Sequence, residues 1–297
     1  MDGLFKAVLK SYLNTTTPIE EAKYTIFGAP LDSTSTYRSG SRFAPGSIRR
    51  ASLYMESYSP RTGLNHGDIS LADAGDLIGL ESVESLGRIE KAISLLTREG
   101  NIPVMIGGEH TITLGALRSL KPDLVICFDA HLDLRNTILG QEMSHGTFMR
   151  RALEELDFRL VTIGVRAISS EELDYAEKNQ DRVSMIQTKM ILRRINDDGY
   201  EFITDWIAGS SSAYISIDMD VVDPAIAPAV GNPSPEGISI TTLLDLIDFC
   251  VRHDVVGFDL TEVTPHYDSG LTAIQAAYIL LETLYSIEKH DRLQSNK

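Results

Sequence analysis

A short apolar run that ends in three regularly spaced polar residues constrains this chain more than any other stretch. Leu124–Cys127 is apolar and too short for a helix, so it predicts a buried strand of an α/β sheet. After Phe128 come Asp129, His131 and Asp133, at alternating positions. If the extended backbone continues that far, these three side chains project to one side. Two carboxylates and an imidazole there would suit a divalent metal ion, and the alternative is a strand end with solvated polar residues.

The remaining sequence alternates between strand-like and helix-like segments, with no linker, repeat or low-complexity stretch. Further strands are predicted at 24–28, 102–106, 159–164, 183–187, 214–217 and 255–258. Helices are predicted from Pro45 and at 81–99, 111–120, 148–156, 169–178, 202–208, 241–252 and 271–287. This alternation favours a single α/β domain over residues 1–297, with a central, mainly parallel sheet and helices on both faces.

Four segments are expected to lie outside this alternation. Residues 1–20 are expected to form an N-terminal extension with a short amphipathic helix, and 68–76 an irregular acidic connection. The segment 221–237 holds four prolines and predicts a long ordered loop. The charged residues after 287 are expected to fray.

The charge and the cysteine content restrict the partners of this chain. A net charge of −15 and a pI near 4.9 argue against nucleic acid or an anionic membrane surface, and fit a cationic ligand or metal ions. Cys127 and Cys250 lie in apolar stretches and predict buried, reduced thiols in a cytoplasmic protein. The first ten residues lack the pattern of a secretory signal, and no apolar run approaches the ~18 residues of a membrane-spanning helix.

Four predicted strands end in residues that can bind metal ions or substrate. Parallel strands present these ends at one edge of the sheet, so residues far apart in sequence can share a site. The ligand candidates are His110, Asp129, His131, Asp133, Asp218 and Asp220, and Glu262 ends a fourth strand. Four Asp and two His exceed the needs of one four-coordinate zinc ion, and suit two ions about 3.5–4 Å apart that share carboxylates and a water. Oxygen-rich ligation favours manganese, and iron, cobalt and zinc remain alternatives.

Several ordered motifs resemble those of the ureohydrolase (arginase/agmatinase) family, over nearly the whole chain. They are Gly107-Gly108-Glu109-His110, Asp129-Ala130-His131-Leu132-Asp133, Ser144-His145-Gly146, Ser216-Ile217-Asp218-Met219-Asp220-Val221-Val222-Asp223-Pro224 and Glu262-Val263-Thr264-Pro265. One departure is Glu109, where many members have aspartate. It precedes a ligand and is not expected to be one itself.

The resemblance implies a binuclear site with two Mn²⁺ ions per subunit. His110, Asp129, Asp133 and Asp218 would hold one ion, and Asp129, His131, Asp218 and Asp220 the other. It also implies that Glu262 pairs with the guanidinium of a small cationic guanidino substrate, that His145 is the proton shuttle, and that the protein is a homo-oligomer, a trimer or hexamer. A carboxylate can accept two N–H bonds from a planar guanidinium, and a histidine can protonate the leaving amine.

The loops around the site look more like those of agmatinases than of arginases. The stretch 133–146 lacks an Asn-rich, Pro-containing segment, and Ala167-Ile168-Ser169-Ser170 lacks the aspartates that arginases present to an α-amino group. Agmatine, hydrolysed to putrescine and urea, is therefore the expected substrate. If Arg135 faces the pocket, guanidinobutyrate or another guanidino acid becomes competitive.

Other functions stay open beside this expectation. Within the family they are guanidinobutyrase, arginase and formimidoylglutamase. Outside it, the chain would be a silent homologue that regulates a polyamine enzyme, or a metal-dependent amide hydrolase acting on acetylated polyamines. A silent homologue predicts broken ligands, whereas all six ligand candidates, His145 and Glu262 are present.

Overall fold

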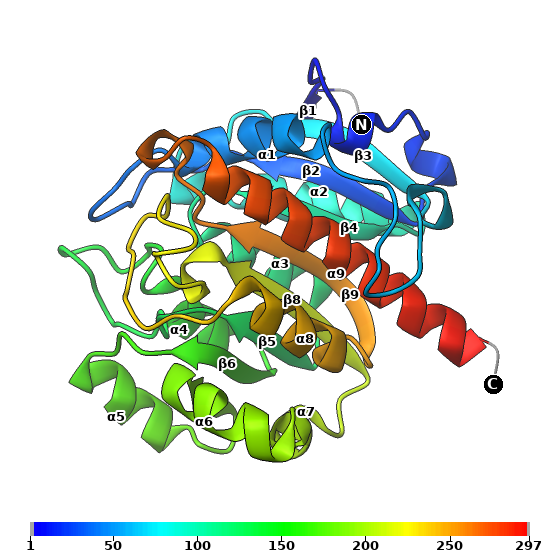
Figure 1. Ribbon diagram of the computed structural model, residues 1–297. Helices are drawn as coiled ribbons and strands as arrows, with labels where there is room; N and C mark the ends of the chain where they lie inside the picture. Colours follow the sequence, from blue (N-terminus) through cyan, green and yellow to red (C-terminus); the bar gives the residue numbers. More distant parts are fainter. Residues whose placement is uncertain (1–2, 296–297) are drawn as a thin grey trace.

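The computed structural model describes residues 3–295, in which one nine-stranded sheet carries helices on both faces (Figure 1). The strands are β1 (Phe5–Lys6), β2 (Tyr24–Ala29), β3 (Leu71–Leu77), β4 (Ile102–Gly107), β5 (Leu124–Phe128), β6 (Arg159–Val165), β7 (Val183–Gln187), β8 (Ser212–Asp218) and β9 (Asp254–Thr261). Their order is β1-β3-β2-β4-β9-β8-β5-β6-β7, and every described pairing is parallel except that of β1 with β3. The predicted α/β class is confirmed.

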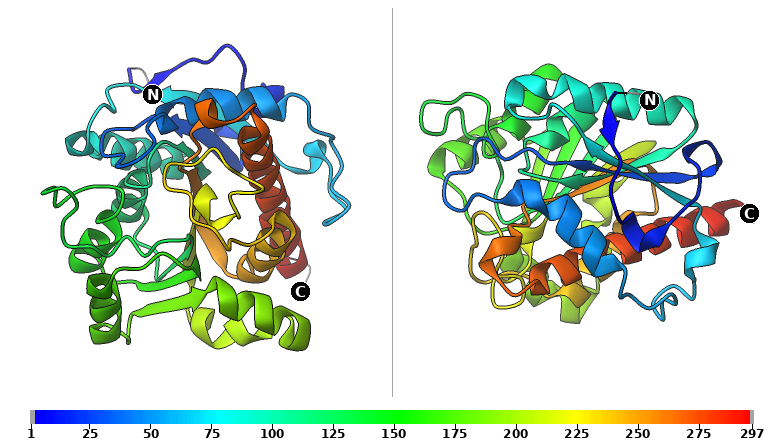
Figure 2. Two further views of the ribbon diagram at one scale, coloured as in Figure 1. Left: turned by 60° about the vertical axis from the view of Figure 1, so that its left-hand side comes forward. Right: turned by 90° about the horizontal axis from the view of Figure 1, so that it is seen from above.

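Helices cover the sheet in two layers, which Figure 2 shows from the side and from above. The helices are α1 (Ala44–Ser52), α2 (Gly87–Arg98), α3 (Ile112–Leu120), α4 (Phe148–Glu155), α5 (Ser170–Lys178), α6 (Thr188–Asp198), α7 (Thr204–Ile207), α8 (Ile240–Cys250) and α9 (Leu271–Ser295). Apolar side chains of α2 to α5 pack on one face, and those of α1 and α6 to α9 pack on the other. Within residues 3–295, no helix combines the length and the apolarity needed to cross a lipid bilayer.

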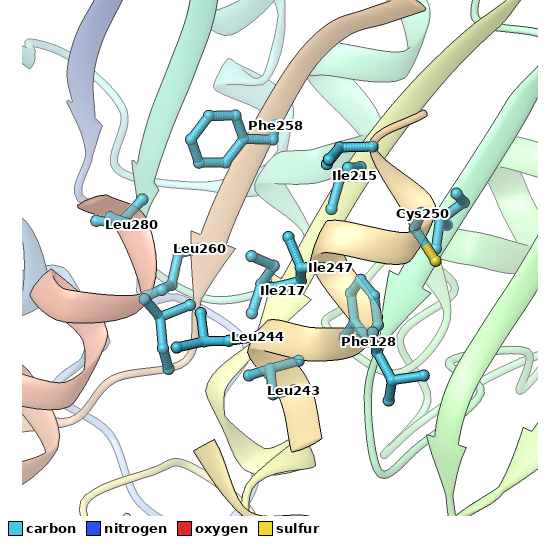
Figure 3. Packing of buried hydrophobic residues seen from close by; sticks show 14 of the residues in the cluster. Phe128, Ile215, Ile217, Leu243, Leu244, Ile247, Cys250, Phe258, Leu260 and Leu280 are labelled. Atoms are coloured by element: carbon cyan, nitrogen blue, oxygen red, sulfur yellow. The ribbon is translucent and has the colours of Figure 1, made fainter. Parts of the chain in front are cut away.

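Alternating strand residues supply both apolar cores. In β5, Ile126 and Phe128 belong to the core under α8 and α9, whereas Val125 and Cys127 belong to the opposite core. A central strand must therefore be apolar on both sides, which explains its continuous apolar run. Figure 3 shows Leu243, Leu244 and Ile247 of α8 against the strands, and burying each such side chain contributes about 1.5–3 kcal/mol.

The helix expected within residues 1–20 is absent from the described residues 3–20. They contain β1 and two single turns of 3₁₀-helix, at Tyr12–Asn14 and Ile19–Glu21. Leu13 and Asn14 have positive φ angles, which an α-helix does not accept. The buried Tyr12 hydroxyl donates to the carbonyl of Ala277 at 2.6 Å, so a contact far away in sequence determines this conformation.

The acidic segment 68–76 was expected to be irregular, and this expectation is wrong because β3 covers most of it. Asp73 and Asp76 of this strand receive hydrogen bonds from the guanidinium of Arg49 in α1, which is 1% exposed. The arginine lies more than twenty residues earlier in the sequence. Local composition therefore gave no sign that these carboxylates are neutralised by a buried cation.

Two helices differ from the sequence prediction. α6 was not predicted, and α9 continues to Ser295 where a frayed tail was expected after 287. Charged residues near the end of α9 have partners on other elements: Glu288 and Asp291 pair with Lys23, and Lys289 pairs with Asp248. These contacts extend the helix beyond its apolar positions.

Candidate metal centre

The candidate site lies where the four central strands of the sheet end. β4, β9, β8 and β5 are consecutive neighbours, and the segments that follow them carry the predicted ligands. All of these ligands except Asp129 line a cavity of about 720 Å³, together with Glu262 and His145. The structure thus brings together residues that are up to 152 positions apart in sequence, such as His110 and Glu262.

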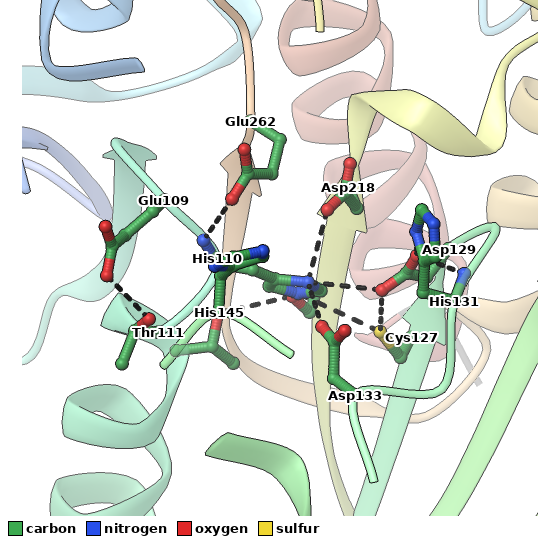
Figure 4. A network of polar contacts seen from close by, with 12 residues as sticks. Glu109, His110, Thr111, Cys127, Asp129, His131, Asp133, His145, Asp218 and Glu262 are labelled. Carbon is green, nitrogen blue, oxygen red and sulfur yellow. Dashed lines mark hydrogen bonds and ion pairs between the residues drawn. The ribbon is translucent and has the colours of Figure 1, made fainter. Parts of the chain in front are cut away.

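His110 points one ring nitrogen at three carboxylates (Figure 4). Its Nδ1 lies 3.2 Å from Asp129 Oδ2, 3.1 Å from Asp133 Oδ2 and 3.3 Å from Asp218 Oδ2. The same Nδ1 is buried and has no hydrogen-bond partner. A nitrogen lone pair facing several carboxylate oxygens in a dry site is an arrangement that a divalent cation satisfies.

A second group forms around His131 and shares Asp129 with the first. His131 Nδ1 lies 2.9 Å from Asp220 Oδ2 and 3.5 Å from Asp129 Oδ1. The two oxygens of Asp129 therefore face different histidines. This division into two groups, joined by one carboxylate, fits the donor set of two neighbouring metal ions.

Asp129, His131 and Asp133 converge for a different reason from the one the sequence suggested. β5 ends at Phe128, and Asp133 has a φ of 53°, so the backbone does not continue as an extended strand. The loop itself turns the side chains inward, and His131 N–H donates to Asp129 Oδ1 at 2.6 Å. Glu262 also has a positive φ, 65°. Non-glycine residues in this region of φ are uncommon, and such strain concentrates at functional sites.

The pKa values at this site show strong mutual interaction between the groups. Burial and the charge of Asp129 together raise the pKa of Asp133 to about 7. Burial opposes charge on His131, yet Asp220 and Asp129 raise its pKa well above the ordinary value. In the protein without ions, protons therefore occupy positions that cations would compete for.

Cys127 also lies near the cluster, but it contacts the other ring nitrogen of the first histidine. Its Sγ is 3.9 Å from His110 Nε2, whereas the carboxylates lie around Nδ1. Burial raises the pKa of this thiol, so it packs as a neutral side chain. Cys127 and Cys250 are both free and buried, as expected.

Glu262 is held beside the cluster by the backbone of a predicted ligand. Its Oε1 accepts the N–H of His110 at 2.8 Å, and its side chain is 6% exposed. Burial and the charge of Asp218 raise its pKa. A Cβ at Gly231 would lie 2.6 Å from Glu262 Oε2, so glycine leaves the space that the carboxylate occupies.

His145 is placed by a loop that a buried glutamate anchors. Glu109 accepts the N–H groups of Ser33 and Thr34 at 2.6 and 2.7 Å. The hydroxyl of Thr34 donates to Glu109 and accepts the backbone N–H of His145 at 3.0 Å. Burial lowers the pKa of His145. Glu109 thus acts on His145 through Thr34, a role that the sequence analysis did not assign.

The outer part of the cavity carries one ion pair and several apolar groups. Arg135 lines it, with a side chain 45% exposed and Nε 3.6 Å from Glu172 Oε2. Glu172 is buried and accepts hydrogen bonds from Ser169 and Leu134. Ile138, Leu139 and Ile168 complete this wall.

Sequence reasoning missed the polar residues that support the histidines. Thr36 and Asn232 lie 3.3 and 3.4 Å from His145 Nε2, and both lie outside the predicted strands and helices. Ser216 and Asp259 lie behind His110. The available signal was Asp259 itself, a carboxylate inside the otherwise apolar strand β9.

Fold and site together define an α/β enzyme with a candidate divalent-metal centre at the carboxyl edge of a parallel sheet.

The model of the Arginase family matches residues 22–285. The agmatinase of Bacillus subtilis is 35% identical over 281 residues, covering 91% of this chain and 93% of that protein. The guanidinobutyrase of Pseudomonas aeruginosa is 34% identical over 270 residues, covering 86% and 84%. A crystal structure of the agmatine ureohydrolase of Thermoplasma volcanium matches with a TM-score of 0.85 and 37% identity, over 97% of each chain. The chain belongs to the arginase family, the ureohydrolases, as its motifs predicted, and it is a hydrolase of that class.

Proposed function

We propose that this protein is a manganese-dependent ureohydrolase that cleaves agmatine to putrescine and urea. The observation that carries the proposal is the position of Glu262, a buried carboxylate beside two histidine–carboxylate groups that share Asp129. Such a site can hold a planar cation next to metal-binding groups. Relatives named agmatinase and the agmatine ureohydrolase structure support the choice of substrate.

The residues that would hold the ions follow the two groups in the site. We assign His110, Asp129, Asp133 and Asp218 to one Mn²⁺, and Asp129, His131, Asp218 and Asp220 to the other. The unpartnered His110 Nδ1 and the excess of oxygen donors support this assignment. When bound, two such ions lower the pKa of a shared water and thereby supply a nucleophile at neutral pH.

Glu262 and His145 carry the remaining steps in this proposal. Glu262 accepts N–H groups of the guanidinium, which fixes the orientation of the carbon that is attacked. His145 lies in the same cavity and transfers a proton to the leaving amine. Burial lowers the pKa of His145 and so favours its neutral form. The neutral imidazole can take up a proton before it transfers that proton to the leaving amine.

Arg135 favours a second candidate substrate, a guanidino acid such as guanidinobutyrate. The arginine lines the outer cavity, where it would attract a carboxylate tail and repel the ammonium tail of agmatine. Glu172 offsets part of this charge at 3.6 Å. The resemblance to the guanidinobutyrase of Pseudomonas aeruginosa also supports this candidate.

Urea release with added Mn²⁺ from agmatine, arginine, guanidinobutyrate and formimidoylglutamate tests the proposal. We expect agmatine to give the highest kcat/KM. Arg135→Leu should improve kcat/KM for agmatine several-fold, whereas Arg118→Leu, at a position that does not line this cavity, should not change it. A preference for guanidinobutyrate that Arg135→Leu abolishes would instead establish the guanidino acid. Absence of activity on all four despite bound metal would favour a regulatory homologue, and turnover of acetylated polyamines an amide hydrolase.

We further propose that the enzyme works as a homo-oligomer, a trimer or hexamer, in the cytoplasm. The family resemblance and the buried free thiols support this proposal. Sedimentation of the purified protein should give a mass of three or six subunits of 32.7 kDa. A monomeric mass would contradict it.

A further inference from the structure

A chain of buried hydrogen bonds leads from His110 away from the metal centre to an aspartate outside the predicted ligand set. His110 Nε2 lies 2.8 Å from Ser216 Oγ, and Ser216 donates to Asp259 Oδ1 at 2.7 Å. Ser216 and Asp259 face each other in the register of β8 and β9, and both are fully buried. The chain therefore crosses two neighbouring strands behind the imidazole.

The number of hydroxyl protons determines the direction of these bonds. Asp259 Oδ2 accepts from Tyr214 and from Thr113, each at 2.7 Å, so the carboxylate receives three hydroxyl donors in all. Burial raises its pKa, and the three donors act in the opposite direction. Ser216 has a single hydroxyl proton, and because that proton goes to Asp259, its oxygen is left to accept from His110. In the neutral form that metal binding requires, His110 then carries its proton on Nε2 and leaves Nδ1 unprotonated.

We propose that Asp259 is a positioning residue for the metal centre, which acts through Ser216 to hold His110 in the tautomer whose Nδ1 can bind an ion. The inference rests on the proposed two-ion centre. Metal-binding histidines depend on the partner of their second nitrogen, and loss of that partner typically lowers metal affinity about 10–100-fold. A merely structural aspartate would instead serve only to satisfy the hydroxyls of Tyr214 and Thr113.

The two-ion centre provides an internal control, because His110 would serve only one of the ions. We would titrate Mn²⁺ into metal-free wild type, Asp259→Asn, Ser216→Ala and the double variant by calorimetry. The amide of Asp259→Asn keeps the shape but can donate to Ser216, which would turn the serine proton toward His110. We expect the affinity for one ion to fall about 10–100-fold and that for the other to stay within about threefold. If both residues act through His110, the double variant should lose no more Mn²⁺ affinity than the more strongly affected single variant.

Tyr214→Phe is the matched control, since it removes a donor from Oδ2 and leaves the bond between Oδ1 and Ser216. It should lower the unfolding temperature while both Mn²⁺ affinities stay within about threefold of wild type. Three results would overturn the inference: unchanged affinities in Asp259→Asn, equal weakening of both ions, or the same single-ion loss in Tyr214→Phe. A wild type that binds fewer than two ions would contradict the proposed centre itself, and this role with it.

Discussion

Asp129 is the residue on which the two halves of the proposed site depend. Its two oxygens face different histidines, and Ala130 N–H, next to it, donates to Asp220. Burial opposes ionisation of Asp129, but the two histidines lower its pKa, whereas the pKa values of Asp133 and Asp218 are raised. Of these three proposed ligands, Asp129 is therefore the most readily ionised. An ionised carboxylate whose two oxygens face different histidines is suited to bridging two ions.

Asp129→Asn should weaken Mn²⁺ binding and reduce urea release to background together. The amide keeps the volume but removes the charge that both ions would share. The matched control is Asp157→Asn, whose side chain is fully exposed and pairs only loosely with Arg182 at 4.0 Å. If Asp129→Asn keeps two tightly bound ions and near-normal activity, the bridging role is wrong.

Glu262→Gln should separate substrate binding from metal binding. The variant keeps an oxygen for the N–H of His110 but loses the charge that would pair with the guanidinium. We expect kcat/KM to fall by about 100-fold, which corresponds to about 3 kcal/mol of lost charged hydrogen bonding. Metal analysis should still find two ions per subunit, and a variant that loses its metal would show that Glu262 supports the ligands instead.

At the scale of the elements, α1 and β3 are joined by a buried ion pair rather than by apolar packing alone. Arg49 reaches Asp73, Asp76 and the carbonyl of Gly75 from the helix. The same Asp73 accepts the N–H of Tyr12, so the N-terminal segment depends on this cluster too.

Arg49→Met should destabilise the protein by about 3–5 kcal/mol, because it leaves the buried Asp73 and the partly exposed Asp76 without their cation. Arg150→Met removes surface ion pairs with Glu154 and Glu171 and a contact with the ring of Tyr175, and should cost about 1 kcal/mol. Denaturant unfolding of the two variants measures both values. Similar small losses in both would mean that water reaches the carboxylate of Asp73 as well as that of Asp76.

The sequence predicted elements well where local pattern and tertiary environment agree. Central strands such as β5 are buried on both faces, so their apolar runs alone identify them. The convergence of the candidate ligands at strand ends could be predicted because carboxylates and histidines directly after apolar runs are chemically conspicuous. β3 and Tyr12–Asn14 could not, since Arg49 and Ala277 stabilise them from distant positions. The same holds for Asp259 and Thr34, whose roles follow from partners on other elements.

At the scale of the whole molecule, the metal centre ties stability to pH. The pKa values of Asp133, His110 and His131 are raised in the folded protein, so it binds more protons than the unfolded chain. The stabilisation from protonated Asp133 is lost as the pH rises toward its folded-state pKa of about 7. The stabilisation from protonated His110 and His131 is complete below the pKa of an unfolded histidine, and it is lost as the pH rises from there through their raised folded-state pKa values. His145, with its lowered pKa, acts in the opposite direction, and so do His66 and His253 elsewhere in the protein. Asp218 and Glu262 have raised pKa values and act in the same direction as Asp133.

Metal-free protein should therefore be less stable at pH 8 than at pH 6, by about 2 kcal/mol. Added Mn²⁺ should remove this difference, because binding displaces the protons and strengthens as pH rises. At a free concentration of 100 times the dissociation constant, one ion adds about 2.7 kcal/mol. Thermal unfolding with EDTA or with Mn²⁺ at both pH values measures the effect, and a metal-free protein that gains stability at pH 8 would contradict it.

The place of β9 in the sheet has a consequence for how the chain folds. β9 is the last strand in the sequence, yet it lies between β4 and β8 at the centre of the sheet. Before it is added, the strands order as two separate half-sheets, β1-β3-β2-β4 and β8-β5-β6-β7, each with an unpaired inner edge. Such edges invite association with other chains, and pairings this distant in sequence form slowly. The proposed ligand His110 belongs to one half-sheet, and the other five proposed ligands, which end or follow β5 and β8, belong to the other. The four residues assigned to the second ion all lie in one half, whereas the set assigned to the first ion needs His110 from the other. We therefore expect a growing chain to complete the first set only after its final strand has joined the two halves.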